Sequence, residues 1–84
     1  MIMDEFLFVN EFAISFDYQG RRMAIVKAYE SSSSKYYDCV LFRDNTIRVH
    51  YNGQQWVESD SNENTPIADA LGSGIVKVLG KDNY

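Results

Sequence analysis

Residues 65–80 read TPIADALGSGIVKVLG and predict a single amphipathic helix. Thr65 is a favoured N-cap residue, and Pro66 suits the first helical position, where its missing N–H costs no hydrogen bond. Gly80 is a good C-terminal stop. Between these ends the apolar residues recur at helical spacing: Ile67, Leu71, Ile75 and Val78. The stretch therefore predicts a helix that packs one face on the rest of the chain.

Two glycines lie inside this predicted helix, Gly72 and Gly74. A glycine in a helix interior costs about 1 kcal/mol relative to alanine. We expect this cost to be offset by close approach of the helix backbone to a sheet.

Upstream, two glycine turns separate alternating apolar runs: Tyr18-Gln19-Gly20-Arg21 and Tyr51-Asn52-Gly53-Gln54. Two-residue loops with glycine second favour a type I′ hairpin turn, since glycine takes positive φ without a steric penalty. The first turn predicts the pairs Tyr18–Arg21, Phe16–Met23, Ile14–Ile25, Asp17–Arg22 and Ala13–Val26. The second predicts the pairs Tyr51–Gln54, Val49–Trp56 and Ile47–Glu58, with His50 beside Gln55. Both turns indicate antiparallel hairpins.

Residues 36–43 form a further expected strand that is apolar on both faces, as central strands often are. Asp44-Asn45 is the next expected turn, and residues 46–51 alternate again. Residues 1–10 are apolar without clean alternation and are expected to be a frayed first strand or an ordered arm. The chain thus predicts one α+β domain over residues 1–84. An antiparallel β-meander of about five strands (11–58) carries one C-terminal helix (65–80) on one face.

A single helix covers one face of a sheet, and the expected core face carries Phe16, Ile25, Val49 and Trp56. The expected uncovered face carries small and apolar side chains together with a polar rim: Ala13, Ala24, Val26, Ala28, Val57, Arg22, Arg48, His50 and Gln55. Cys39 and Leu41 join this face if the strand at residues 36–43 has the matching register, which its two apolar faces leave open. Exposed apolar patches often mark interfaces. An ordinary solvated sheet face is the alternative.

The composition of the chain argues against several classes of function. The net charge of −4 argues against nucleic acid and anionic lipid, which bind basic faces. No apolar run approaches the roughly 20 residues of a membrane helix. A single cysteine, Cys39, forms no intramolecular disulfide, and the acidic N-terminus lacks the basic start of a signal peptide. We expect a cytoplasmic protein.

Candidate catalytic residues are few. His50 is the lone histidine and is expected on the outer sheet face, without the acid or nucleophile that catalysis requires. Cys39 lies mid-strand and is expected to behave as a buried small hydrophobe. One histidine and one cysteine do not supply a zinc site of about four ligands. The scattered carboxylates and glycines match no calcium or phosphate-loop motif. We expect no cofactor, no metal and no catalytic residues.

Residues 52–58 (NGQQWVE) followed by residues 68–75 (ADALGSGI) resemble a group of small bacterial proteins with no assigned function. In that group a β-meander ends in a tryptophan strand and is followed by a linker and a helix rich in small and apolar residues. The resemblance covers roughly the last 40 residues closely and the first half only in pattern. It implies the meander-plus-helix fold and no catalytic residues.

The sequence therefore favours a small non-catalytic protein-interaction or assembly module, as a homodimer or with another protein. Its interface would use the uncovered sheet face or an edge strand. The expected interface residues are Ala24, Val26, Leu41, Arg48, His50 and Val57. The alternative is a small enzyme or small-molecule binder, with a pocket between helix and sheet lined by Tyr29, Tyr51 and Trp56.

Overall fold

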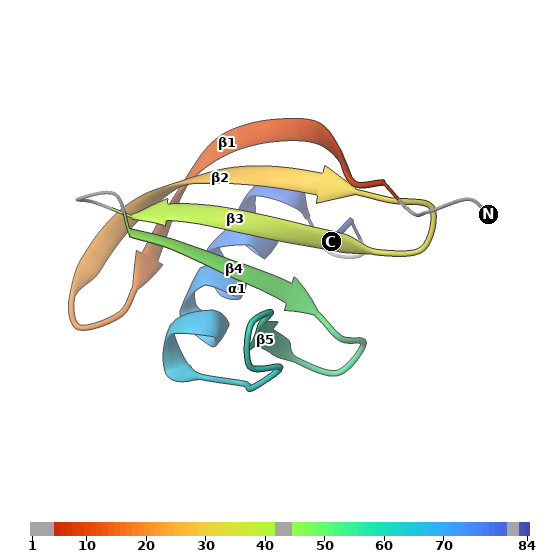
Figure 1. Ribbon diagram of the computed structural model, residues 1–84. Helices are drawn as coiled ribbons and strands as arrows, with labels where there is room; N and C mark the ends of the chain where they lie inside the picture. The colour runs from red at the N-terminus through yellow and green to blue at the C-terminus, as the bar shows by residue number, and fades with distance from the viewer. Residues whose placement is uncertain (1–4, 42–44, 81–82) are drawn as a thin grey trace.

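The computed structural model describes residues 5–41, 45–80 and 83–84, which form five strands and one helix (Figure 1). The strands are β1 (Leu7–Asp17), β2 (Arg21–Glu30), β3 (Lys35–Leu41), β4 (Asn45–Tyr51) and β5 (Trp56–Glu58), and the helix α1 spans Pro66–Leu79. Neighbours in the sheet follow the chain order β1-β2-β3-β4-β5, and each pairing is antiparallel. The predicted α+β meander is confirmed.

The first strand includes part of the segment 1–10, since β1 begins at Leu7. A bulge interrupts its pairing with β2 between Phe8 and Asn10. Residues 1–4 and 42–44, which include the end of the predicted third strand and Asp44 of the predicted turn, lie outside the described residues.

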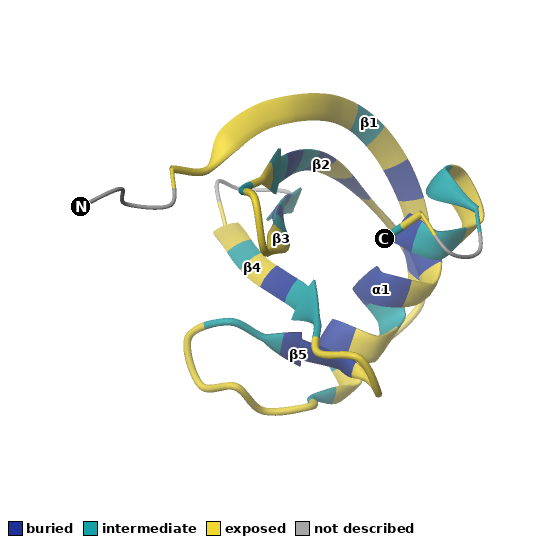
Figure 2. Ribbon diagram, turned by 90° about the vertical axis from the view of Figure 1, so that its right-hand side faces the viewer, coloured by how far each residue is buried: buried dark blue, intermediate teal, exposed yellow. Residues whose placement is uncertain are grey.

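The sheet curves around the helix, which lies on the concave side between β1 and β5 (Figure 2). In the core, α1 contacts β1, β4 and β5. Over the described residues, the convex side of the sheet carries no helix, and we call it the outer face.

The register of the β1–β2 hairpin differs from the prediction by one residue. Asp17 pairs with Arg21 and Ile14 with Ala24, so Tyr18, Gln19 and Gly20 all lie in the loop. Gln19 and Gly20 have positive φ as expected for this turn, but the Tyr18 amide donates to the Gly20 carbonyl at 3.0 Å. A slip of one residue moves every side chain of a strand to the other face. Ile25 therefore lies on the outer face, and Ala24, Val26 and Ala28 lie in the core.

The β4–β5 hairpin has a loop of four residues, Asn52–Gln55, instead of two. Tyr51 pairs with Trp56 and Val49 with Glu58. The Asn52 side-chain oxygen accepts hydrogen bonds of 2.9 Å from the amides of Gln54 and Gln55, which holds the longer loop together. A shift of two residues preserves the face of each side chain. Trp56 therefore lies on the Val49 face, and the prediction that this face is the core is confirmed.

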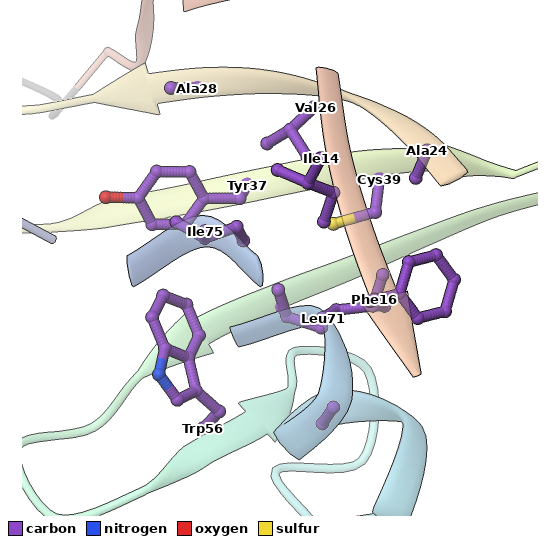
Figure 3. Packing of buried hydrophobic residues seen from close by; sticks show 12 residues of the cluster. Ile14, Phe16, Ala24, Val26, Ala28, Tyr37, Cys39, Trp56, Leu71 and Ile75 are labelled. Atoms are coloured by element: carbon purple, nitrogen blue, oxygen red, sulfur yellow. The ribbon is translucent and has the colours of Figure 1, made fainter. Parts of the chain in front are cut away.

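The core fills the space between the concave sheet face and α1 (Figure 3). Large side chains of β1 lie opposite small ones of β2, since Ile14 pairs with Ala24 and Phe12 with Val26. From the helix, Leu71 and Ile75 are fully buried. The buried cluster is Ile14, Phe16, Ala24, Val26, Ala28, Tyr37, Cys39, Val49, Trp56, Ala68, Leu71 and Ile75.

Both helix glycines lie where the helix touches the sheet, which confirms the expected close approach. A methyl group built on Gly72 would overlap the indole ring of Trp56. One on Gly74 would lie 2.9 Å from the Ser15 carbonyl oxygen and 3.0 Å from Ile14 Cδ1. The backbone of α1 therefore packs directly on β1 and on Trp56.

The N-terminus of α1 is fixed by Thr65, as predicted. Its hydroxyl accepts a hydrogen bond from the Ala68 amide at 3.2 Å and donates one to Glu58 Oε2 at 2.6 Å. Thr65 therefore links the helix start to β5. At the other end Gly80, with φ 88°, donates its amide to the Val76 carbonyl.

Replacing Thr65 with alanine is expected to lower the free energy of unfolding by about 1–2 kcal/mol. The variant loses an N-cap, which typically contributes about 1 kcal/mol, and the bond to the Glu58 carboxylate. Urea unfolding followed by circular dichroism measures the loss. Thr65→Ser keeps the hydroxyl and should retain most of the stability; an equal loss in both variants would contradict the capping role.

Candidate functional site

The outer face is the side of the sheet opposite α1, and the register arranges its side chains in rows across the strands. Residues paired directly between antiparallel strands share a face. Three rows result: an aromatic row (Phe8, Tyr29, Tyr36), a charge row (Glu11, Lys27, Asp38, Arg48) and an aliphatic row (Ala13, Ile25, Val40). Met23, opposite Ser15, continues the apolar surface toward the β1–β2 turn.

Several apolar side chains on this face are open to solvent. Met23 is 67% exposed, Phe8 55% and Ile25 43%. Met23 and Ile25 lie in neighbouring rows on β2, and Phe8 lies on β1 beyond the charge row. An apolar surface of this kind on a sheet that no helix covers is typical of an interaction site.

The aromatic row is ordered by ring contacts. Tyr29 and Tyr36 stack with ring centroids 5.0 Å apart and planes inclined by 17°. Phe8 meets the Tyr29 ring edge-on at 5.7 Å, and Phe6, just before β1, meets the Tyr36 ring edge-on at 4.8 Å. Because each ring supports the next, this row presents a fixed aromatic surface.

The charge row alternates in sign across the four longer strands. Glu11 pairs with Lys27, Lys27 with Asp38, and Asp38 with Arg48. The Arg48 guanidinium holds the Asp38 carboxylate through two bonds, Nε–Oδ1 at 2.7 Å and Nη2–Oδ2 at 3.2 Å, and lies 4.0 Å from the Tyr36 ring centroid. The hydrogen bond to Asp38 raises the pKa of Arg48 above its ordinary value. This end of the row is therefore charged and geometrically fixed.

Half of the predicted interface residues lie in the interior instead. Ala24 and Val26 belong to the core beneath the helix, because the β1–β2 register differs by one residue. Leu41 is half-buried against the same cluster, whereas Val57 lies opposite His50 on the other face of the sheet and is 1% exposed. Arg48 and His50 lie on the outer face as expected, with Arg48 exposed and His50 half-buried. The outer face is thus a different surface from the one predicted.

His50 has a partner that the sequence did not reveal. It lies opposite Val57, not beside Gln55, and its Nδ1 lies 2.8 Å from the Ser59 hydroxyl. Both residues line an open cavity of about 760 Å³ at the end of the sheet, together with Tyr36, Arg48 and Tyr84. Among the described residues, no carboxylate is hydrogen-bonded to the His50 ring, so the pair lacks the third group that orients a catalytic histidine. We interpret the bond as one that ties the loop after β5 to β4.

The pocket predicted between helix and sheet is filled. Tyr29 lies on the outer face, in the aromatic row. Trp56 packs against Gly72 of the helix, and its ring centroid lies 5.7 Å from that of Tyr51 and 5.5 Å from that of Tyr84. Tyr51 and Trp56 are therefore brought together, and Tyr29 lies on the other face of the sheet.

Cys39 is fully buried, as predicted, and it lies on the core face of β3 and not on the uncovered face. Burial, followed by the negative charge of Asp38, raises the pKa of its thiol to about 12. Because the thiolate is the reactive form, this thiol is a packing group and not a nucleophile. Across the part of the chain that the structure describes, no cluster of three or more histidine, cysteine or acidic side chains is placed to bind a metal.

Comparisons with protein-family models, curated proteins and solved structures gave no match. Over the described residues, no helix has the length and apolar character to cross a membrane.

Proposed function

We propose that the protein is a non-catalytic interaction or assembly module that binds a protein partner with its outer sheet face. The observation that carries this proposal is the exposure of Met23, Phe8 and Ile25 on a sheet face with no helix above it. Such side chains gain free energy when a partner removes them from water, at roughly 25 cal/mol per Å² of apolar area. The rigid aromatic row and the charge row lie on the same surface. They would fix the orientation of the partner and make its binding specific.

Two lysine substitutions on the outer face test the proposal. A tagged Met23→Lys/Ile25→Lys double variant is compared with the wild type in an extract of the native cells, and co-purified proteins are quantified by mass spectrometry. The protein's own untagged chain counts as a partner. We expect the variant to co-purify a much smaller amount of the partner protein than the wild type does. Binding would remove the two introduced charges from water without pairing them.

Val78→Lys is the matched control, since Val78 is 49% exposed but lies on α1, away from the outer face. It should retain the partner at the wild-type level. Circular dichroism must show that all three proteins are folded. Equal retention by the outer-face variant and the wild type would rule this face out as the binding surface.

A further inference from the structure

The charge row on the outer face has a symmetry that bears on the identity of the partner. Along the row the signs alternate from β1 to β4: Glu11 negative, Lys27 positive, Asp38 negative, Arg48 positive. The row is neutral, although the whole chain carries a net charge of −4. A second copy therefore meets no net repulsion at this face, whereas its other surfaces carry the excess negative charge.

The order of the signs selects one arrangement of two copies. Consider two outer faces packed together, with a two-fold axis between the sheets and parallel to the strands. In this arrangement β1 faces β4 of the other copy and β2 faces β3. Glu11 then faces Arg48 of the second copy, and Lys27 faces Asp38. All four cross-copy pairs are opposite in charge.

The two flanking rows also match in this arrangement. Tyr29 faces Tyr36 of the second copy in the aromatic row, and Ile25 faces Val40 in the aliphatic row. The other face-to-face two-fold, perpendicular to the strands, would place Glu11 against Glu11 and Arg48 against Arg48. Like charges directly opposite one another destabilise such a pairing.

We propose that the outer face binds a second copy of this chain, forming a two-sheet sandwich with the two-fold axis parallel to the strands. This inference rests on the proposed function, because it names the partner of the same surface. Face-to-face sheets pack about 10 Å apart with strands aligned to within about 30°, which on this convex face brings the facing side chains of the central strands, β2 and β3, into contact. The exposed Ile25 is then covered by Val40 of the second copy.

A charge exchange within the row tests the arrangement. The double variant Glu11→Lys/Lys27→Glu keeps the net charge and the opposite-charge pair between β1 and β2. In the dimer it places the introduced lysine against Arg48 of the second copy, and the introduced glutamate against Asp38. Mass is measured by light scattering over concentrations up to about 1 mM.

We expect the wild type to show twice the chain mass of 9.7 kDa and the variant to dissociate with a Kd at least roughly 100-fold higher. The control is Asp17→Arg/Arg21→Asp, which exchanges the other ion pair of this face, 2.8 Å long, near the β1–β2 turn. Those two residues lie beyond the ends of β3 and β4, so this control should dimerise like the wild type.

Two results would overturn the inference: a wild type that stays monomeric at every concentration, or a charge-exchange variant that dimerises as tightly as the wild type. Neither result decides the proposed function. The wild type could be monomeric and yet bind a different protein that the Met23→Lys/Ile25→Lys variant no longer binds. The outer face would then still be an interaction surface, with that protein as its partner. A monomer without any face-dependent partner would remove both proposals.

Discussion

Replacing Gly72 with alanine is expected to lower the free energy of unfolding by about 2 kcal/mol. The added methyl group would overlap the Trp56 indole, which is 7% exposed and held between Tyr37, Tyr51 and Tyr84. Overpacking a tight core typically costs about 1–3 kcal/mol. Alanine regains about 1 kcal/mol of helix propensity, but the indole has no free side toward which it can move. Urea unfolding followed by Trp56 fluorescence measures the net loss.

Ser73→Ala is the control for this substitution. Ser73 is the next residue of the same helix and is exposed, so the change gives a smaller gain in helix propensity without touching Trp56. Its free energy of unfolding should stay within about 0.5 kcal/mol of the wild type. If Gly72→Ala is as stable as Ser73→Ala, the helix backbone at Gly72 does not pack directly on the Trp56 side chain.

The helix was predictable because its signals are local. Thr65, Pro66 and Gly80 mark its ends, and each acts on backbone groups within a few residues of itself. The face of Trp56 was also predictable, since a hairpin loop two residues longer than expected leaves the same face inward. The helix and the face of Trp56 are therefore predicted correctly even when the predicted length of the hairpin loop is wrong.

The register of β2 was not predictable, because both of its faces are apolar. Met23 and Ile25 alternate with Ala24, Val26 and Ala28, so hydrophobic pattern alone does not decide which set is buried. Tertiary packing decides, because the alanine set of β2 belongs to the buried cluster that also contains Leu71 and Ile75 of the helix. These two helix residues lie far downstream in the sequence.

The candidate site could not be predicted for the same reason. The charge row exists only when Glu11 lies opposite Lys27, and Lys27 opposite Asp38, so a slip of one residue removes it. The contact between His50 and Ser59 joins residues nine positions apart, through a loop that carries no recognisable motif. Surface rows on a sheet follow from the register, and here tertiary packing fixes the register.

Stability is expected to fall steeply in alkaline solution, and Cys39 is the main cause. The pKa of its thiol is raised from an ordinary value of 9.0 to about 12 in the folded protein, first by burial and then by the charge of Asp38. Between these values the unfolded chain loses a proton that the folded state retains, so the free energy of unfolding decreases as the pH rises. The slope is about 1.4 kcal/mol per pH unit, which amounts to about 3 kcal/mol at about pH 11.

Tyr37 acts in the same direction at higher pH. Burial, and then the negative charge of Glu30, raise the pKa of its phenol from 10.0 to about 12. The decrease in the free energy of unfolding that Tyr37 causes begins above about pH 10. The decrease that Cys39 causes begins about one pH unit lower. Urea unfolding at intervals from about pH 8 to pH 11 separates the two contributions by their onset.

Cys39→Ala and Tyr37→Phe assign the two contributions. Each variant loses some stability at neutral pH by removing buried atoms, so the slope of stability against pH is compared and not its absolute value. Cys39→Ala should lose the decline that starts near pH 9, and Tyr37→Phe the part that starts near pH 10. An unchanged slope in Cys39→Ala would show that the thiol ionises as readily in the folded protein as in the unfolded chain. That would contradict its burial between the sheet and α1.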